Sequence, residues 1–357
     1  MSMRWSRYVT ASGDDAFRDL WRELAAEPTV VILGGGFDPR THRALELLAE
    51  VATAPLHLVR LDIDGGEDAD IEIRELAETN RATIDTIVRS TDATLVEQDY
   101  PDVHARRSAG ITMSRTFHEA GHLAGAQQVV IDISGLPRSI YFPFVRGLLL
   151  AADGDWGGNV HVVASESAQT DAAIIKEGAE DPRALGGFGG QTREIEWAAT
   201  VWVPVLGEGM TQQLSALLEA IGADEVVPVL PFPARNPRRG DDLLLEHREL
   251  LLDRLLVEPR NYLYAAESNP FDLYRAITDL HNRYQEALRP LGAARFLLST
   301  HSSKLLSTGV LLAAHEIGLE VMHVSPSRYG VRQGVDLTAL AADCTPTNLW
   351  LAGDAYR

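Results

Sequence analysis

Two short segments of the sequence place a hydroxyl group four positions before a cation, which is a combination suited to phosphate binding. Thr300 precedes Lys304 in one segment, and Ser134 precedes Arg138 in the other. Each hydroxyl ends an apolar run typical of a strand, and each cation begins a helical pattern. The N–H groups at a helix start attract anions, and hydroxyl and cationic side chains add charge-assisted hydrogen bonds. We therefore expect both segments to contribute to a site for a phosphorylated ligand.

The segment that begins at Thr300 is the more phosphate-like of the two, because further polar residues lie within it: His301, Ser302 and Ser303. Their side chains could hold a phosphate group together with Lys304. Ser302 or Ser303 could equally serve as a plain N-cap, which requires no ligand. The sequence leaves both interpretations open.

Glycine-containing turns follow the first expected strand of each half of the chain. Their glycines would let the backbone approach a ligand closely, and the candidates are Gly34, Gly36, Gly207 and Gly209. Neither turn has the complete G-x-G-x-x-G pattern, so a dinucleotide cofactor held in the usual way is weakly supported. Asp38 and Arg40, just after Gly36, are polar candidates for the same site. A tight turn without a ligand explains these glycines as well.

A local group of arginines follows the expected strand at residues 225–232. In an acidic chain, such a group indicates an anion-binding site more strongly than it would in a basic chain. Its members are Arg235, Arg238 and Arg239. Side chains that could bind a base or a sugar are Glu267, Asn269 and Asp272, together with Asp62 or Asp64 for a ribose hydroxyl. Asn269 followed by Pro270 could instead simply begin a helix.

A competing chemistry is suggested by a literal H-E-x-x-H motif. His118 and His122 are four residues apart within a helical pattern, with Glu119 between them. On one helix face, two such histidines could bind zinc while the glutamate polarises a bound water, as in zinc metalloproteases. A solvated helix face is the alternative, and no clear third ligand follows in the sequence.

The elements that must position these residues are short β-branched strands alternating with amphipathic helices, which predicts an α/β fold with parallel sheets. The expected strands are residues 29–35, 56–64, 93–100, 127–134 and 160–167, then 199–206, 225–232, 261–268, 294–300 and 319–325. A glycine-rich stretch separates the two groups. We therefore expect Rossmann-like domains at 1–168 and 197–357, joined by a linker at 169–196.

The two halves also align with each other, which predicts an internal repeat. The turn at Gly34–Gly36 matches the turn at Gly207–Gly209, and the Ser134 and Thr300 segments match as well. In each half the third strand ends just before a proline, Pro101 or Pro270. Shared βα turn chemistry could produce the same landmarks without duplication.

Composition excludes several classes of protein. In 357 residues, 32 Lys and Arg stand against 51 Asp and Glu, and the formal net charge of −19 argues against a broad nucleic-acid surface. The single cysteine, Cys344, excludes an internal disulfide framework. No signal-peptide core and no apolar run of membrane-spanning length is found, so we expect a cytoplasmic protein without a membrane partner.

The loops at Ser134–Arg138 and Thr300–Lys304 resemble the fourth-strand loops of CRISPR-associated Rossmann-fold (CARF) sensor domains. Such domains carry a hydroxyl, small residues and a Lys or Arg at this place and bind cyclic oligoadenylates across a pair of Rossmann units. The resemblance implies that the four residues face one ligand, that a protein partner or effector acts on the signal, and that the setting is antiviral defence. This sequence lacks the Gly-Gly that often precedes the basic residue.

The leading functional hypothesis is binding of a nucleotide or another phosphorylated small ligand in a cleft between two Rossmann-like halves, as a sensor or regulatory subunit. A glycosyltransferase that uses nucleotide sugars is an alternative, in which residues 301–303 would hold the diphosphate and Glu267 would act as a base. Zinc hydrolysis by the H-E-x-x-H residues is the second alternative.

Overall fold

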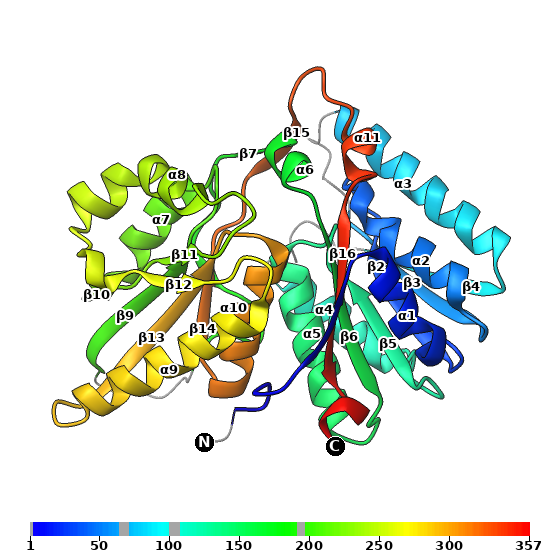
Figure 1. The fold of residues 1–357 in the computed structure, drawn as a ribbon, viewed down its shortest axis with the longest axis horizontal. Coiled ribbons are helices and arrows are strands. Elements are labelled where there is room, and N and C mark those ends of the chain that lie inside the picture. The colour runs from blue at the N-terminus through cyan, green and yellow to red at the C-terminus, as the bar shows by residue number, and fades with distance from the viewer. Residues whose placement is uncertain (1–2, 64–70, 100–107, 191–196) are drawn as a thin grey trace. The chain divides into compact units, whose positions relative to one another are not determined.

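The computed structural model describes residues 3–63, 71–99, 108–190 and 197–357, and the chain divides into two compact units (Figure 1). The N unit consists of Arg7–Ile175 and Tyr329–Arg357, and the C unit consists of Lys176–Arg328 and Met1–Ser6. Asp64, Pro101 and residues 191–196 of the expected linker lie outside the described residues.

The N unit contains a mixed sheet in which the described strands follow the order β1-β16-β6-β5-β2-β3-β4. The five strands from β6 to β4 run parallel, whereas β16 pairs antiparallel with both β6 and β1. The strand bounds are β1 (Val9–Ser12), β2 (Thr29–Gly34), β3 (Leu56–Asp62), β4 (Ala93–Asp99), β5 (Gln128–Asp132), β6 (Asn159–Glu166) and β16 (Thr345–Ala352). Every residue of β2 and β5 is buried, as expected for central strands covered on both faces.

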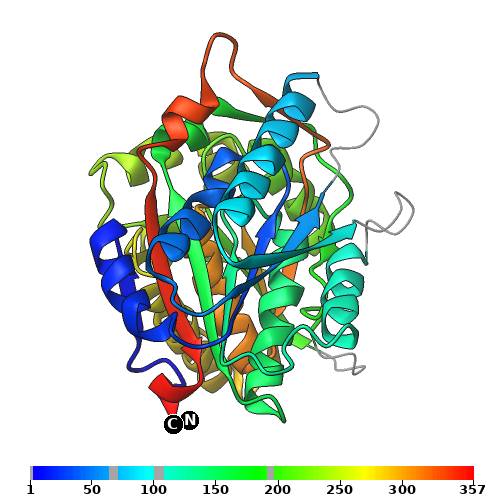
Figure 2. The same cartoon turned by 90° about the vertical axis from the view of Figure 1, so that its right-hand side faces the viewer.

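Helices cover both faces of this sheet. The helix bounds are α1 (Asp14–Leu24), η1 (Pro39–His42), α2 (Arg43–Val51), α3 (Ile71–Ser90), α4 (Ala109–Glu119), α5 (Arg138–Asp153), α6 (Ala168–Ala173), α11 (Leu337–Ala341) and η5 (Asp354–Tyr356). Phe17 and Trp21 of α1 belong to one hydrophobic cluster with residues of α2, α3 and β2. Figure 2 shows α2 and α3 in front of the strands. Among the described residues, no helix is both long and apolar enough to cross a membrane.

The C unit contains a second sheet, in which the described strands follow the order β12-β11-β9-β13-β14-β8. Strands β12 to β14 of this order run parallel, and β8 is antiparallel to β14. The strand bounds are β8 (Arg183–Ala184), β9 (Trp197–Val205), β10 (Glu225–Val226), β11 (Val229–Pro231), β12 (Leu263–Ala265), β13 (Ala293–Thr300) and β14 (Glu320–His323). Strands β7 (Ile174–Glu177) and β15 (Arg328–Val331) pair in a separate sheet.

Two of the C-unit helices end at glycines. The bounds of the C-unit helices are α7 (Thr211–Ile221), α8 (Arg239–Glu246), the π-helical turn η3 (Glu249–Arg254), η4 (Pro259–Asn261), α9 (Pro270–Leu288) and α10 (Lys304–Ile317). Helices α7 and α10 end at Gly222 and Gly318, whose left-handed backbone favours glycine. Figure 1 shows α7 and α8 on one face of the sheet and α9 and α10 on the other.

In each unit the first core strand, β2 or β9, lies inside its sheet. The next strands along the chain add to one side of that strand, and the later strands add to its other side. The N unit passes from β2 to β3 and β4 and returns to β5, and the C unit passes from β9 to β11 and β12 and returns to β13. This doubly wound arrangement confirms the α/β prediction. The internal repeat stays a prediction.

The structure differs from the sequence-based expectation at the C-terminus. Residues 329–357, expected in the second domain, belong to the N unit because β16 pairs with β6 along almost its whole length. Because β6 and β16 are far apart in the sequence, no local sequence pattern indicates that they pair. The expected strand at 225–232 is interrupted between β10 and β11 at Val227 and Pro228, where proline cannot donate a ladder hydrogen bond.

A close approach between α4 and α5 leads to a stability prediction. A Cβ atom at Gly110 would lie 2.0 Å from the carbonyl oxygen of Ser139 and 2.6 Å from Cγ of Pro143. We expect Gly110→Ala to lower the free energy of unfolding by about 1–3 kcal/mol in urea denaturation, because neither neighbour can move easily. Gly36→Ala is the matched control, since a Cβ there meets no atom within 4 Å. Equal stability of the two variants would contradict this packing.

Candidate functional site

In the C unit, β9 and β13 end side by side at the point where the strand order reverses, and ligands of open α/β sheets bind at such switch points, so this edge is the candidate site. The turn after β9 touches the loop after β13. A Cβ at Gly207 would lie 2.0 Å from the carbonyl oxygen of His301, so only glycine fits there. The N–H of His301 in turn donates to the carbonyl oxygen of Val205 at 3.1 Å.

The side chains predicted to bind phosphate after β13 are largely engaged in structural contacts. Thr300 is buried, and its hydroxyl lies 2.8 Å from Oγ of Ser307. Ser303 caps α10 by accepting from the N–H of Leu306 at 3.3 Å, which is the plain N-cap alternative. His301 and Ser302 are also buried, and the His301 ring stacks on His323 with centroids 6.0 Å apart. Lys304, half-buried, begins α10.

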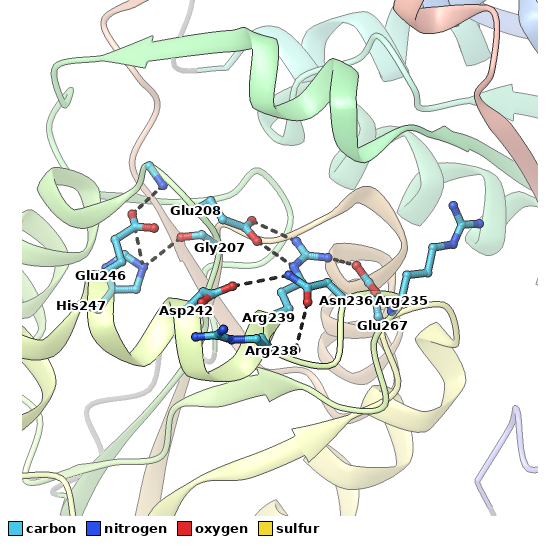
Figure 3. Close-up of polar contacts among 11 residues, drawn as sticks. Gly207, Glu208, Arg235, Asn236, Arg238, Arg239, Asp242, Glu246, His247 and Glu267 are labelled. Atoms are coloured by element: carbon cyan, nitrogen blue, oxygen red, sulfur yellow. Dashed lines mark hydrogen bonds and ion pairs between the residues drawn. The ribbon is translucent and has the colours of Figure 1, made fainter.

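The turn after β9 is held by two residues at the end of α8 that sequence reasoning missed (Figure 3). The N–H of Gly209 donates to Oε1 of Glu246 at 2.6 Å, and Gly209 has a left-handed backbone with φ of 71°. His247 is fully buried, with Nε2 3.0 Å from the Gly207 carbonyl oxygen and Nδ1 3.1 Å from Oγ1 of Thr211. Nothing in the local pattern distinguishes these residues from the rest of an acidic helix.

Arg239 lies between two glutamates and is therefore not a free cation. Its Nε and Nη2 atoms donate to Glu208 at 2.7 and 3.0 Å, and its Nη1 atom donates to Glu267 (Figure 3). Burial alone would raise the pKa of Glu208, but hydrogen bonding to Arg239 and the charge of its guanidinium lower the pKa below its ordinary value. The second carboxylate oxygen of Glu267 accepts from the N–H of Arg235 at 2.7 Å. Both oxygens of Glu267 are thus occupied, which does not suit a general base.

Asn269 and Asp272 have local structural roles. Asn269 caps α9 by accepting from the N–H of Phe271 at 3.1 Å, with Pro270 as the first helical residue. Asp272 accepts from the N–H of Ala266 at 2.8 Å. The plain helix start is therefore what the structure shows at this position.

Arg235 and Arg238 remain as exposed cations on the loop between β11 and α8. Their guanidinium groups form no ion pair or hydrogen bond with the described residues, whereas the N–H of Arg238 donates to Oδ1 of Asn236 at 3.0 Å. Figure 3 shows both side chains outside the Glu208–Arg239–Glu267 network. Close to the turn after β9, a cavity of about 510 Å³ is lined by Lys176, Glu177, Gly178, Gly209, Thr211 and Gln212.

In the N unit, three of the predicted ligand-binding side chains are buried in internal contacts, those of Asp38, Arg40 and Ser134. Arg40 donates to Asp38 at 2.7 and 3.0 Å and pairs with Asp171 at 2.9 Å. Burial alone would lower the pKa of Arg40, but these carboxylates raise it above its ordinary value. Ser134 accepts from the N–H of Ser165 at 2.7 Å. Arg138 begins α5.

The glycine turn of the N unit is also tightly packed on one side. A Cβ at Gly34 would lie 3.0 Å from Leu136, and one at Gly35 would lie 2.2 Å from Oδ1 of Asp62. Asp62 accepts from Nε of Arg60 at 2.9 Å, so its carboxylate is not free for a ribose hydroxyl. Gly36 faces open space.

Asp132 is a buried carboxyl group that sequence reasoning missed. It ends β5 at the N-unit switch point, and its Oδ1 accepts from the N–H of Ser134 at 2.8 Å. Its Oδ2 atom has no hydrogen-bond partner among the described residues. Burial raises the pKa of Asp132 to about 7, an effect that the hydrogen bonds from Ser134 oppose and the charge of Asp38 reinforces. An aspartate inside an apolar strand run could have signalled it.

The prediction that the H-E-x-x-H residues share one helix face is wrong. Helix α4 ends at Glu119, and Gly121 has a left-handed backbone with φ of 74°, so His122 lies in the turn beyond the helix. Glu119 is exposed and pairs with Arg115 at 3.7 Å. In the part of the chain that the structure describes, no three His, Cys, Asp or Glu side chains form a potential metal cluster.

Asp132 should make stability depend on pH. Its pKa is raised in the folded state from 3.8, so its favourable contribution is complete at low pH and declines as pH rises through about 7. We expect the stability of the wild type relative to Asp132→Asn to fall by up to about 1.4 kcal/mol per pH unit between about pH 4 and 7, measured by urea unfolding. Asp92→Asn, at an exposed position, is the control. A difference between wild type and Asp132→Asn that is independent of pH would show that Asp132 does not titrate in this range.

Comparisons with known proteins add little to this geometry. No protein-family model matches the chain, and no curated protein matches it. Among solved structures, the chain is similar to the crystal structure of the cytoplasmic domain of a prokaryotic cation chloride cotransporter, with 12% sequence identity and a TM-score of 0.25 over 88% of this chain and 99% of that chain. At that TM-score the likeness supports no inference about function.

Proposed function

We propose that the chain binds a nucleotide or another phosphorylated small ligand at the carboxyl edge of the C-unit sheet, as a sensor or regulatory subunit. The observation that carries the proposal is the pair of exposed guanidinium groups, Arg235 and Arg238, on a loop that is anchored at this edge. Arg239 anchors the loop by pairing with Glu208 and Glu267. Because the chain is strongly acidic, two unpaired cations on a loop beside the β9–β13 switch point favour an anionic ligand.

Further groups at the same edge support a phosphate. Helices α7 and α10 begin there, and helix starts present N–H groups and partial positive charge to anions. Lys304 is the first residue of α10, and Lys176 lines the cavity beside the start of α7. These groups suit the phosphate of a nucleotide more than a neutral metabolite.

Binding without turnover is favoured over the transferase alternative. The transferase required Glu267 as a base, yet both of its carboxylate oxygens accept hydrogen bonds, from Arg239 and from the N–H of Arg235. A sensor needs only the ligand and a protein partner that responds to it. By its resemblance to CARF domains, the chain would bind the ligand while a partner protein acts on the signal, in antiviral defence. Because nucleotides are made inside the cell, we propose a cytoplasmic location.

A ligand panel tests the proposal. Isothermal titration and thermal unfolding with AMP, ATP, cyclic oligoadenylates, nucleotide sugars and inorganic phosphate should identify a ligand, which at about 100 times its Kd stabilises by about 2.7 kcal/mol. The double variant Arg235→Ala/Arg238→Ala should bind that ligand about tenfold more weakly or worse, because charge-assisted hydrogen bonds to phosphate are lost. Lys304→Ala should weaken binding in the same direction.

Arg283→Ala is the matched control, since Arg283 is exposed on α9 of the same unit. Arg138→Ala removes the corresponding cation of the N unit and should leave the affinity unchanged if the C unit alone binds the ligand. Absence of binding by every member of the panel would refute the function. A ligand whose affinity is the same in the double variant would refute the site.

A further inference from the structure

His122 of the H-E-x-x-H motif contacts a histidine of another element. Nε2 of His57, on β3, lies 3.0 Å from Nδ1 of His122, in the turn after α4. The two ring centroids are 5.2 Å apart. His118, by contrast, directs its Nε2 toward Gly147 of α5, where a Cβ would lie 3.0 Å from it. The two histidines of the motif therefore have different surroundings: His118 packs between α4 and α5, and His122 pairs with His57.

The other ring nitrogen of His57 is held by a hydroxyl group. Nδ1 of His57 lies 2.8 Å from Oγ1 of Thr94, on β4. When Nδ1 carries the proton and donates to Thr94, the lone pair of Nε2 faces His122. A hydrogen bond that fixes the tautomer and orientation of an imidazole in this way is typical of histidines that bind metal ions.

Both imidazoles are partly accessible to solvent. His57 and His122 are half-buried, Thr94 is exposed, and the Phe117 ring lies 5.2 Å from that of His122.

We propose that His57 and His122 form a binding site for a divalent transition metal ion such as zinc, with Nε2 of His57 and Nδ1 of His122 as the protein ligands and water at the remaining positions. A tetrahedral ion with Zn–N distances of about 2.0–2.1 Å holds two nitrogens about 3.3 Å apart. The two nitrogens now face each other in a direct hydrogen bond at 3.0 Å, so both rings must turn until their lone pairs converge on the ion. His122 moves its proton from Nδ1 to Nε2, so binding releases no proton.

Zinc titration of the untagged full-length chain, freed of metal by chelation, tests the site. Isothermal titration should show about one zinc ion bound per chain, with binding lost or weakened at least tenfold in His57→Gln and in His122→Gln. Thr94→Val should weaken binding by about tenfold, because loss of an outer-shell hydrogen bond has that effect. Magnesium should not bind, because it prefers oxygen ligands.

His118→Gln is the matched control and should bind zinc as the wild type does. Thermal unfolding without metal establishes that each variant is folded, and a variant that unfolds is replaced by His57→Asn or His122→Asn. Absence of zinc binding by the wild type, or equal affinity in the folded His57 and His122 variants, would overturn the proposal. Loss of binding in His118→Gln alone would overturn it as well and return the metal to the original motif.

Discussion

The contact between Gly207 and the main chain of His301 determines how the candidate site of the C unit is built. Because no Cβ fits between the two loops, the turn after β9 and the start of α10 are held at one place on the sheet edge. The turn is then fixed from the other side by Glu246 and His247. Several side chains that the sequence suggested as ligand-binding, such as those of Thr300 and Ser303, instead form hydrogen bonds that hold the start of α10.

Charge pairing decides which cations remain for a ligand. Arg239 is neutralised by Glu208 and Glu267, and in the N unit Arg40 is neutralised by Asp38 and Asp171. Buried or half-buried guanidinium groups require such partners, because an unpaired charge away from water is costly. The exposed arginines of the same loop are solvated and need none. A cation therefore becomes available for binding when it lies outside the network that anchors its loop.

The histidines of the H-E-x-x-H motif show that a sequence motif need not have the geometry of its usual site. His118 and His122 would share one helix face only if the helix continued through both residues. Helix α4 ends at Glu119, and Gly121 has a left-handed backbone, so they do not. The pairing of His122 with His57 joins residues that are far apart in sequence. Asp132 likewise acquires its raised pKa from burial at the end of β5, which no local spacing reports.

The α/β class, most of the strands and the sheet edge where the polar loops gather could be predicted from the sequence, because hydrophobic periodicity, glycine turns and helix caps are local signals. The place of residues 329–357 in the N unit became clear only from the folded chain, since strands pair without regard to their distance along the sequence. The same holds for which side chains are paired and which are exposed. Ion pairs such as Arg239 with Glu267 form between segments that only folding brings together. The sequence therefore indicated which cations lie near the site, but not which of them are free to bind a ligand.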